Sequence, residues 1–287
     1  MTKKAKKKRI SGIEIIAYLV VTLAALCCIV PFLYIISVSL TAQEVYVPFE
    51  FRLFPKKLSL ENYAYVLKND AFVTALLNTV FITLVGTFLC ISVTFTYAYA
   101  LTKKDMPGYK FMISMVIASM LFNPGIVSQF LTVKGFGLLN SRWALIIPVL
   151  SSYYYVILAK TSIAGIPADL EEAARIDGAN DLTIFFRIIL PLSKAVLATL
   201  VLFLAVYHWN VYFNSVVYIN DSKLRTLQVY VKTLIIDNAV DSIDVEKVPS
   251  ELIRYATVVL AMLPIVVVYP FLQKHFVKGV MVGSVKG

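Results

Sequence analysis

The stretch EEAARIDGANDLTIFFRIILP, residues 171–191, is the most informative part of the chain. With the preceding Asp169 it carries five acidic residues and two arginines, yet strongly apolar sequence lies on both sides of it. A polar segment between apolar runs is expected where a membrane protein returns to water. The surrounding sequence indicates on which side of a membrane this segment lies.

The composition is that of an integral membrane protein. Of 287 residues, 59% are hydrophobic and only 15% are charged, with a mean hydropathy of +0.79, whereas soluble domains are about a quarter charged. Several apolar runs reach the roughly 20 residues that a helix needs to cross a membrane, where backbone groups must be satisfied within the segment. We therefore expect an all-α polytopic membrane protein with six transmembrane helices. The expected spans are 13–38, 71–101, 110–131, 143–160, 190–216 and 252–273.

Charge predicts the orientation. The N-terminal sequence MTKKAKKKR is basic, and the apolar stretch after it is too long for a signal peptide, so we expect an uncleaved first span. With the N-terminus inside, most of the 27 lysine and arginine residues lie on inner segments. This predicts a multi-pass plasma-membrane protein with both termini cytoplasmic, and it makes the connection 161–189 cytoplasmic. No basic face suggests nucleic-acid binding.

We divide the chain into four parts. They are a cytoplasmic N-terminus (1–12), a first span with an extracellular segment (13–70), a membrane domain (71–273) and a cytoplasmic tail (274–287). The tail contains lysine and glycine, and it would contact either anionic membrane lipid or a cytoplasmic partner.

Local signals within 161–191 predict a helix–turn–helix. Pro167 suits the first turn of a short helix, whose early acids favour the positive end of the helix dipole. Gly178 can end that helix in the left-handed conformation. Asp181 or Thr183 can cap a second helix, and Pro191 marks the entry to the fifth span. Such a unit is either a solvated interfacial helix or a docking surface for a cytoplasmic partner, and local signals leave both open.

The same residues resemble a known motif. Glu-Ala-Ala, three residues, glycine, nine residues and then Ile-x-Leu-Pro is the pattern of the EAA motif, which marks membrane subunits of ABC importers. The resemblance implies a type I ABC importer permease fold whose cytoplasmic coupling helix docks on an ATP-binding subunit. The residues that would make this contact are Glu172, Ala173, Ala174, Asp177, Gly178, Ile188, Leu190 and Pro191.

The resemblance extends over nearly the whole chain. ALLNTVFITLVGTFLCISVTFTYAYALTK resembles the start of the permease domain, and HWNVYF at 208–213 is similar to carbohydrate importers of the MalG and LplC type. It implies four kinds of partner: a second permease chain in a heterodimer, two ATP-binding subunits, an extracytoplasmic solute-binding protein and membrane lipid. ATP and Mg²⁺ would bind the ATP-binding subunits, with no cofactor on this chain. Oligosaccharides or glycan fragments are the implied cargo, with a non-sugar solute as the alternative.

The sequence contains no enzyme motif. It lacks the phosphate-binding GxxxxGK[ST] loop, the HExxH zinc motif and the GxSxG nucleophile motif. The three cysteines lie in apolar spans without metal-ligand spacing, so we expect no catalytic residue and no metal site. A membrane-embedded enzyme is the remote alternative.

Polar and aromatic residues inside the spans are candidates for the translocation path, because intramembrane polar groups are costly and tend to face a bundle or a water-filled path. Hydrogen bonding between helices is the competing explanation. The candidates are Asn78, Asn123, Tyr154, Trp209 and Asn210.

Overall fold

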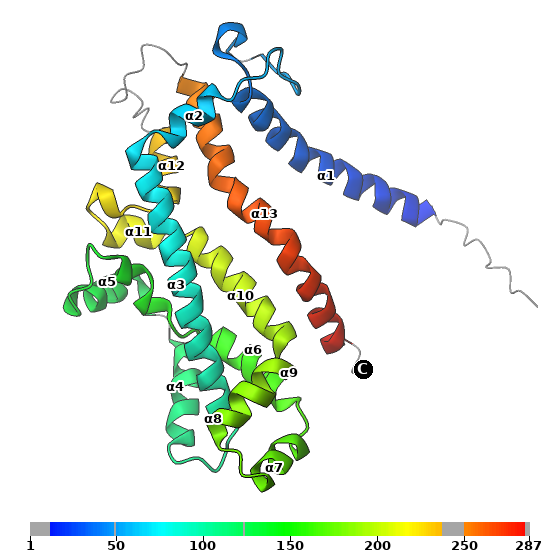
Figure 1. The fold of residues 1–287 in the computed structure, drawn as a ribbon, viewed down its shortest axis with the longest axis vertical. Coiled ribbons are helices and arrows are strands. Elements are labelled where there is room, and N and C mark those ends of the chain that lie inside the picture. Colours follow the sequence, from blue (N-terminus) through cyan, green and yellow to red (C-terminus); the bar gives the residue numbers. More distant parts are fainter. Residues whose placement is uncertain (1–11, 49, 123, 237–249, 285–287) are drawn as a thin grey trace, which may run out of the picture. The chain divides into compact units, whose positions relative to one another are not determined.

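The computed structural model of the chain describes residues 12–236 and 250–284, apart from 49 and 123. This part of the chain is helical and contains no strand, only an isolated antiparallel bridge between Thr41 and Leu58 (Figure 1). The α-helices are α1 (Gly12–Ser39), α2 (Glu61–Leu67), α3 (Asp70–Ala100), α4 (Tyr109–Leu121), α5 (Gly125–Gly135), α6 (Tyr153–Ala164), α7 (Asp169–Ile176), α8 (Asp181–Ile184), α9 (Leu190–Leu192), α10 (Lys194–Trp209), α11 (Phe213–Tyr218), α12 (Leu227–Ile236) and α13 (Ser250–Ser284). Short 3-10 turns are η1 (Gln43–Val45), η2 (Arg142–Leu145), η3 (Ile147–Val149) and η5 (Ser222–Leu224), and η4 (Phe185–Ile189) is a π-helical turn.

The described residues form two compact units. The first contains residues 12–68 and 250–260, and the second contains residues 69–236 and 261–284.

In the first unit, buried polar side chains hold the segment that follows α1. The Asn62 amide of α2 donates to the backbone oxygens of Ser39 and Thr41, at 3.0 Å each. The Tyr63 hydroxyl lies 2.6 Å from the Ser39 hydroxyl, and the Tyr46 hydroxyl donates to Glu251 at the start of α13. These bonds pair the buried Ser39 and Asn62 side chains, as most buried polar groups are paired.

The core of the second unit is the packing of α3 against α10. A Cβ at Gly86 of α3 would lie 2.7 Å from two atoms of the His208 ring of α10, which is fully buried. One of these two atoms, the ring nitrogen Nε2 of His208, also lies 3.5 Å from the Cys90 sulfur. Glycine is therefore required at position 86 for this approach, in the way that small residues allow membrane helices to pack closely.

Among the described residues, three helices are long and apolar enough to cross a membrane: α1, α3 and the portion of α13 over Glu251–Val268. Two bent pairs of helical segments also reach this length and apolarity when each pair is taken together: residues Arg142–Val149 with α6, at 49°, and residues Asp181–Leu192 with α10, at 82°. These five segments match five of the predicted spans. The fifth predicted span was too long at its C-terminal end, because α10 ends at Trp209 and α11 is a separate helix.

The predicted third span, 110–131, was wrong as one continuous helix. The helix α4 ends at Leu121 and α5 begins at Gly125, and neither is long enough to cross a membrane alone. Pro124 removes a backbone donor and Gly125 has a φ of 71°, so helical hydrogen bonding cannot continue through this point.

Candidate functional site: the charged segment and the polar span residues

The helix α7 ends as its sequence predicts, but it begins at Asp169, so Pro167 lies two residues before its first turn and not within it. Three acids occupy its first turn, where the helix dipole favours them. At its end Gly178 adopts a left-handed conformation with φ 83°. Its backbone N–H donates to Arg175 O at 3.0 Å, and the N–H of Ala179 donates to Ala174 O at 2.9 Å. These two bonds form a complete Schellman motif, which fixes the direction in which the chain leaves the helix.

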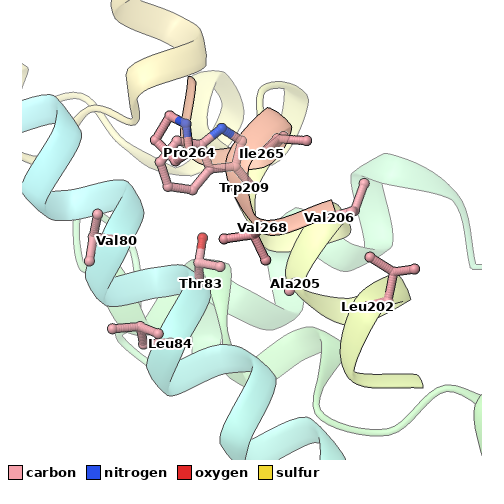
Figure 2. A pocket seen from close by; sticks show the side chains of 10 residues that line it. All are labelled: Val80, Thr83, Leu84, Leu202, Ala205, Val206, Trp209, Pro264, Ile265 and Val268. Atoms are coloured by element: carbon pink, nitrogen blue, oxygen red, sulfur yellow. The ribbon is translucent and has the colours of Figure 1, made fainter. Parts of the chain in front are cut away.

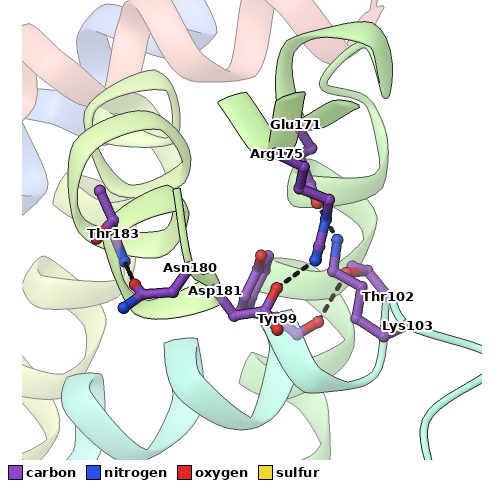
Figure 3. Close-up of polar contacts among 8 residues, drawn as sticks. All are labelled: Tyr99, Thr102, Lys103, Glu171, Arg175, Asn180, Asp181 and Thr183. Atoms are coloured by element: carbon purple, nitrogen blue, oxygen red, sulfur yellow. Dashed lines mark hydrogen bonds and ion pairs between the residues drawn. The ribbon is translucent and has the colours of Figure 1, made fainter. Parts of the chain in front are cut away.

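The second short helix has a different cap from the two predicted. Asn180 is extended (φ −81°, ψ 167°), and its side-chain oxygen accepts a 2.8 Å hydrogen bond from the backbone N–H of Thr183. The prediction of Asp181 or Thr183 as the cap was wrong, because helical geometry begins at Asp181 itself, which makes the extended Asn180 the N-cap. Asp181 instead pairs with Arg175, so that the two short helices are joined across the turn (Figure 3).

The end of α3 holds α7 in place. Lys103, three residues beyond α3, forms an ion pair with Glu171 of α7 (Figure 3). Its Nζ also lies 4.8 Å from the centre of the Tyr99 ring, which in turn packs against the Phe185 ring at 5.4 Å. The Glu171 side chain is only 16% exposed, so this pair is better shielded from water than a typical surface ion pair. The start of α7 is thus attached to a long helix of the bundle.

The EAA motif residues divide between two surfaces. Ala174, Ile188 and Leu190 are half-buried and pack against the apolar cluster that includes Phe95 and Ile184. The remaining motif members are exposed: Glu172, Ala173, Asp177, Gly178 and Pro191. The motif therefore fastens the segment to the bundle with one set of residues and presents a free surface with the other.

Two apolar residues on the exposed side were not selected from the sequence. Ile176 is 87% exposed and Leu182 is 69% exposed. Ile176 lies one turn after Glu172, on the same face of α7. The sequence did contain a signal that could have identified Ile176, since it lies four residues after the motif glutamate Glu172.

After the second short helix the chain turns sharply into the bundle. The helical stretch Asp181–Leu192 is bent by 82° from α10, with the break at Ser193. Pro191 lies just before this break, as predicted for the entry to the fifth span. A π-helical turn over Phe185–Ile189 precedes it, and such turns are frequent at functional sites.

The predicted path residues do not share one surface. Asn78 is buried, and its amide donates to the backbone oxygens of Lys223 at 2.8 Å and Arg225 at 3.1 Å. Tyr154 is 57% exposed, and Asn123 lies outside the described residues. Asn78 thus forms hydrogen bonds within the protein, which was the alternative to a place on the translocation path. The assignment of these residues to the path stays a prediction.

Trp209 lines an apolar cavity of about 210 Å³ in the second unit (Figure 2). Its indole N–H donates to Ala261 O at 3.3 Å, and the other lining residues are Val80, Thr83, Leu84, Leu202, Ala205, Val206, Pro264, Ile265 and Val268. Apart from the Thr83 hydroxyl the described lining offers a sugar little to bond with. The cavity suits an apolar group better than an oligosaccharide.

Asn210 ends α10 and is exposed. Its side-chain N–H donates to Val206 O at 2.8 Å, and its side-chain oxygen accepts a 3.4 Å hydrogen bond from Gln228 of α12. Asn210 therefore lies between α10 and α12 on an accessible part of the second unit.

Comparisons with known proteins agree with this architecture. Residues 72–282 match the family model described as "Binding-protein-dependent transport system inner membrane component". The polygalacturonan/rhamnogalacturonan transport system permease protein YtcP of Bacillus subtilis (strain 168) is 39% identical, with 96% of this chain and 98% of the relative covered. Protein LplC of the same strain is 42% identical, with 90% of each chain covered.

A solved structure has the same fold. It is that of a bacterial ABC transporter involved in the import of the acidic polysaccharide alginate. One of its chains matches with a TM-score of 0.85 and 31% identity, covering 96% of this chain and all of that one (100%).

Proposed function

We propose, because this chain belongs to the family of binding-protein-dependent transport system inner membrane components, that it couples oligosaccharide import to ATP hydrolysis on partner subunits. Membership makes the chain a membrane permease subunit of an ABC importer and not an enzyme. The single observation that carries the coupling role is the α7 segment. It is attached to the bundle on one side and exposes Glu172, Ala173 and Ile176 on the other.

The coupling role requires a rigid connection. A cytoplasmic subunit that moves when it binds ATP must displace the spans, and a flexible loop would absorb that movement. The Schellman turn at Gly178, the Asn180 cap and the Lys103–Glu171 pair all reduce the freedom of the segment. The exposed face of α7 would then transmit the movement of its partner to α3 and α10.

We assign the partners from the same reasoning. One ATP-binding subunit docks on α7 of this chain, and a second docks on the equivalent segment of another permease chain in a heterodimer. Nucleotide and Mg²⁺ bind to those subunits, and an extracytoplasmic binding protein delivers the solute. Residues 12–29 of α1 are exposed and mostly apolar, and we assign this surface to contact with lipid or with the second permease chain.

The orientation follows from this assignment. Docking of an ATP-binding subunit requires α7 to be cytoplasmic, which places both termini in the cytoplasm and α12 outside. The names of the relatives point to a glycan cargo, since YtcP and the alginate importer are both described by the polysaccharide that they transport.

A charge reversal tests the docking surface. In a transporter reconstituted with its partner subunits and binding protein, Glu172→Lys should abolish oligosaccharide uptake and reduce co-purification of the ATP-binding subunit. Asp105→Lys is the matched control, because Asp105 is an exposed acid in the neighbouring connection after α3. If Glu172→Lys assembles and transports as well as Asp105→Lys does, α7 is a solvated helix and the proposed coupling role is wrong.

A further inference from the structure

A second accessible site lies on α11 and α12. It is a groove of about 440 Å³, within the size range of small-molecule sites. The residues that line it are Tyr212, Val216, Ile219, Arg225, Val229, Lys232, Thr233 and Ile236. Among these described residues two are cationic and none is acidic, so the groove has a net positive charge.

The two cations are presented in different ways. Lys232 of α12 lies with its Nζ 4.2 Å from the centre of the Tyr212 ring, a cation–π contact that holds the ammonium group at the groove. Arg225 is half-buried, and neither cation forms an ion pair within the described part of the chain. A guanidinium group without an acidic partner can bind a carboxylate through two parallel hydrogen bonds.

The rest of the lining strengthens such a contact. Val216, Ile219, Val229 and Ile236 are apolar, and Ile219 and Val229 are themselves buried. Buried apolar residues lower the local dielectric constant, so opposite charges attract more strongly beside Ile219 and Val229 than in bulk water, whereas Val216 and Ile236 are 48% and 61% exposed and leave the groove open to solvent. The Thr233 hydroxyl adds a neutral hydrogen-bonding group of the kind that a sugar hydroxyl requires.

The backbone at Arg225 is also held firmly. Its carbonyl oxygen accepts from the Asn78 amide of α3, and the N–H of Leu227, two residues on, donates to the Thr79 hydroxyl at 2.8 Å. From Asn78 the helix α3 continues for roughly 33 Å, at 1.5 Å per residue, to the end that holds α7. The groove and the α7 segment are thus attached to opposite halves of one helix.

We propose that this groove binds the carboxylate group of an acidic oligosaccharide, with Arg225 and Lys232 as the anion-binding residues and Tyr212 as a positioning residue. The inference rests on the proposed function, since it assigns the cargo to the uronic-acid class of glycan. Asn210 accepts a hydrogen bond from Gln228, the residue of α12 that precedes the groove-lining Val229.

The test uses the complete transporter in vesicles with two probes, trigalacturonate and its methyl ester, in which a neutral methyl ester replaces each carboxylate. Arg225→Gln and Lys232→Gln should each raise the half-saturating concentration of trigalacturonate by about tenfold, the scale of a charge-assisted hydrogen bond. Both should leave that of the ester within about twofold. Lys223→Gln is the matched control, because Lys223 is an exposed lysine two residues from Arg225 that does not line the groove.

Three results would overturn the inference. The first is equal loss for the acidic and the esterified probe, and the second is no loss for either. The third is weaker docking of the empty binding protein in the glutamine variants, which would mean that the groove receives an acidic surface of that protein. A different result would contradict the proposed function itself: a wild-type transporter that imports neither of the two probes nor any neutral oligosaccharide. Import of neutral sugars alone contradicts only the acidic assignment.

Discussion

Replacement of Gly178 by alanine tests the backbone conformation of the turn after α7 separately from the chemistry of its exposed surface. Gly178 has a φ of 83°, and a Cβ built there meets nothing within 4 Å. The variant therefore has no internal clash, and its cost is the left-handed conformation alone, about 1–2 kcal/mol. The lower conformational entropy of the unfolded chain offsets part of this. A net cost of about 1 kcal/mol corresponds to a roughly fivefold smaller equilibrium constant for forming the turn.

We expect Gly178→Ala to weaken binding of the ATP-binding subunit by about fivefold, because the partner must restore the turn when it docks. Asparagine tolerates the left-handed region better than alanine does, so Gly178→Asn should lose only about twofold. Gly165→Ala is the control, since Gly165 ends α6 in the same connection with an ordinary φ of −81°. The assay is titration of the purified ATP-binding subunit onto vesicles that contain both permease chains, followed by substrate-stimulated ATPase.

The pattern across the three variants decides the reasoning. Equal loss for alanine and asparagine would show that a side chain at 178 obstructs the partner, and that backbone conformation is not the cause. Wild-type binding by Gly178→Ala would refute the argument that the turn must be preformed.

Three further predictions concern the bundle. Gly86→Val should lower the free energy of unfolding of the purified protein by about 1–3 kcal/mol, because the valine side chain would overlap the His208 ring. In a thermal unfolding experiment, His208→Ala in the same chain should recover part of this loss. Lys103→Glu should reduce uptake per ATP hydrolysed by separating α7 from α3, and adding Glu171→Lys should restore it; no recovery in the double variant would argue against the ion pair. Asn78→Ala should destabilise the protein by about 1–3 kcal/mol in denaturant unfolding, because the carbonyl oxygens of Lys223 and Arg225 lose their donor, and an unchanged midpoint would contradict this.

Features set by neighbouring residues were predictable from the sequence. The acids before Ala173 and the glycine at 178 predicted a short helix and a left-handed turn, and the structure has both. Long apolar runs predicted α1, α3 and α13. In these cases hydrophobicity, dipole and backbone sterics act over a few residues, and no distant contact opposes them.

Features that depend on distant contacts were not predictable. The pairing of Lys103 with Glu171 joins residues 68 positions apart, and the bond from Asn78 to Lys223 joins residues 145 apart. Periodicity gives no information about such pairs. The third span failed for a local reason: its hydrophobicity continues through Pro124, whereas helical hydrogen bonding does not.

The exposed isoleucine of α7 provides the most direct test of coupling. Cys27, Cys28 and Cys90 are first replaced by alanine, and a single cysteine is placed at Ile176, which is 87% exposed. A second single-cysteine protein carries the label site at Ser222, an exposed position in η5 near the groove. The rate of maleimide labelling is then compared in detergent, for the two permease chains alone and with the ATP-binding subunits bound. We predict that binding protects position 176 by at least about tenfold and leaves position 222 unchanged. Equal labelling at 176 in both samples would contradict the central claim that α7 docks on the ATP-binding subunit.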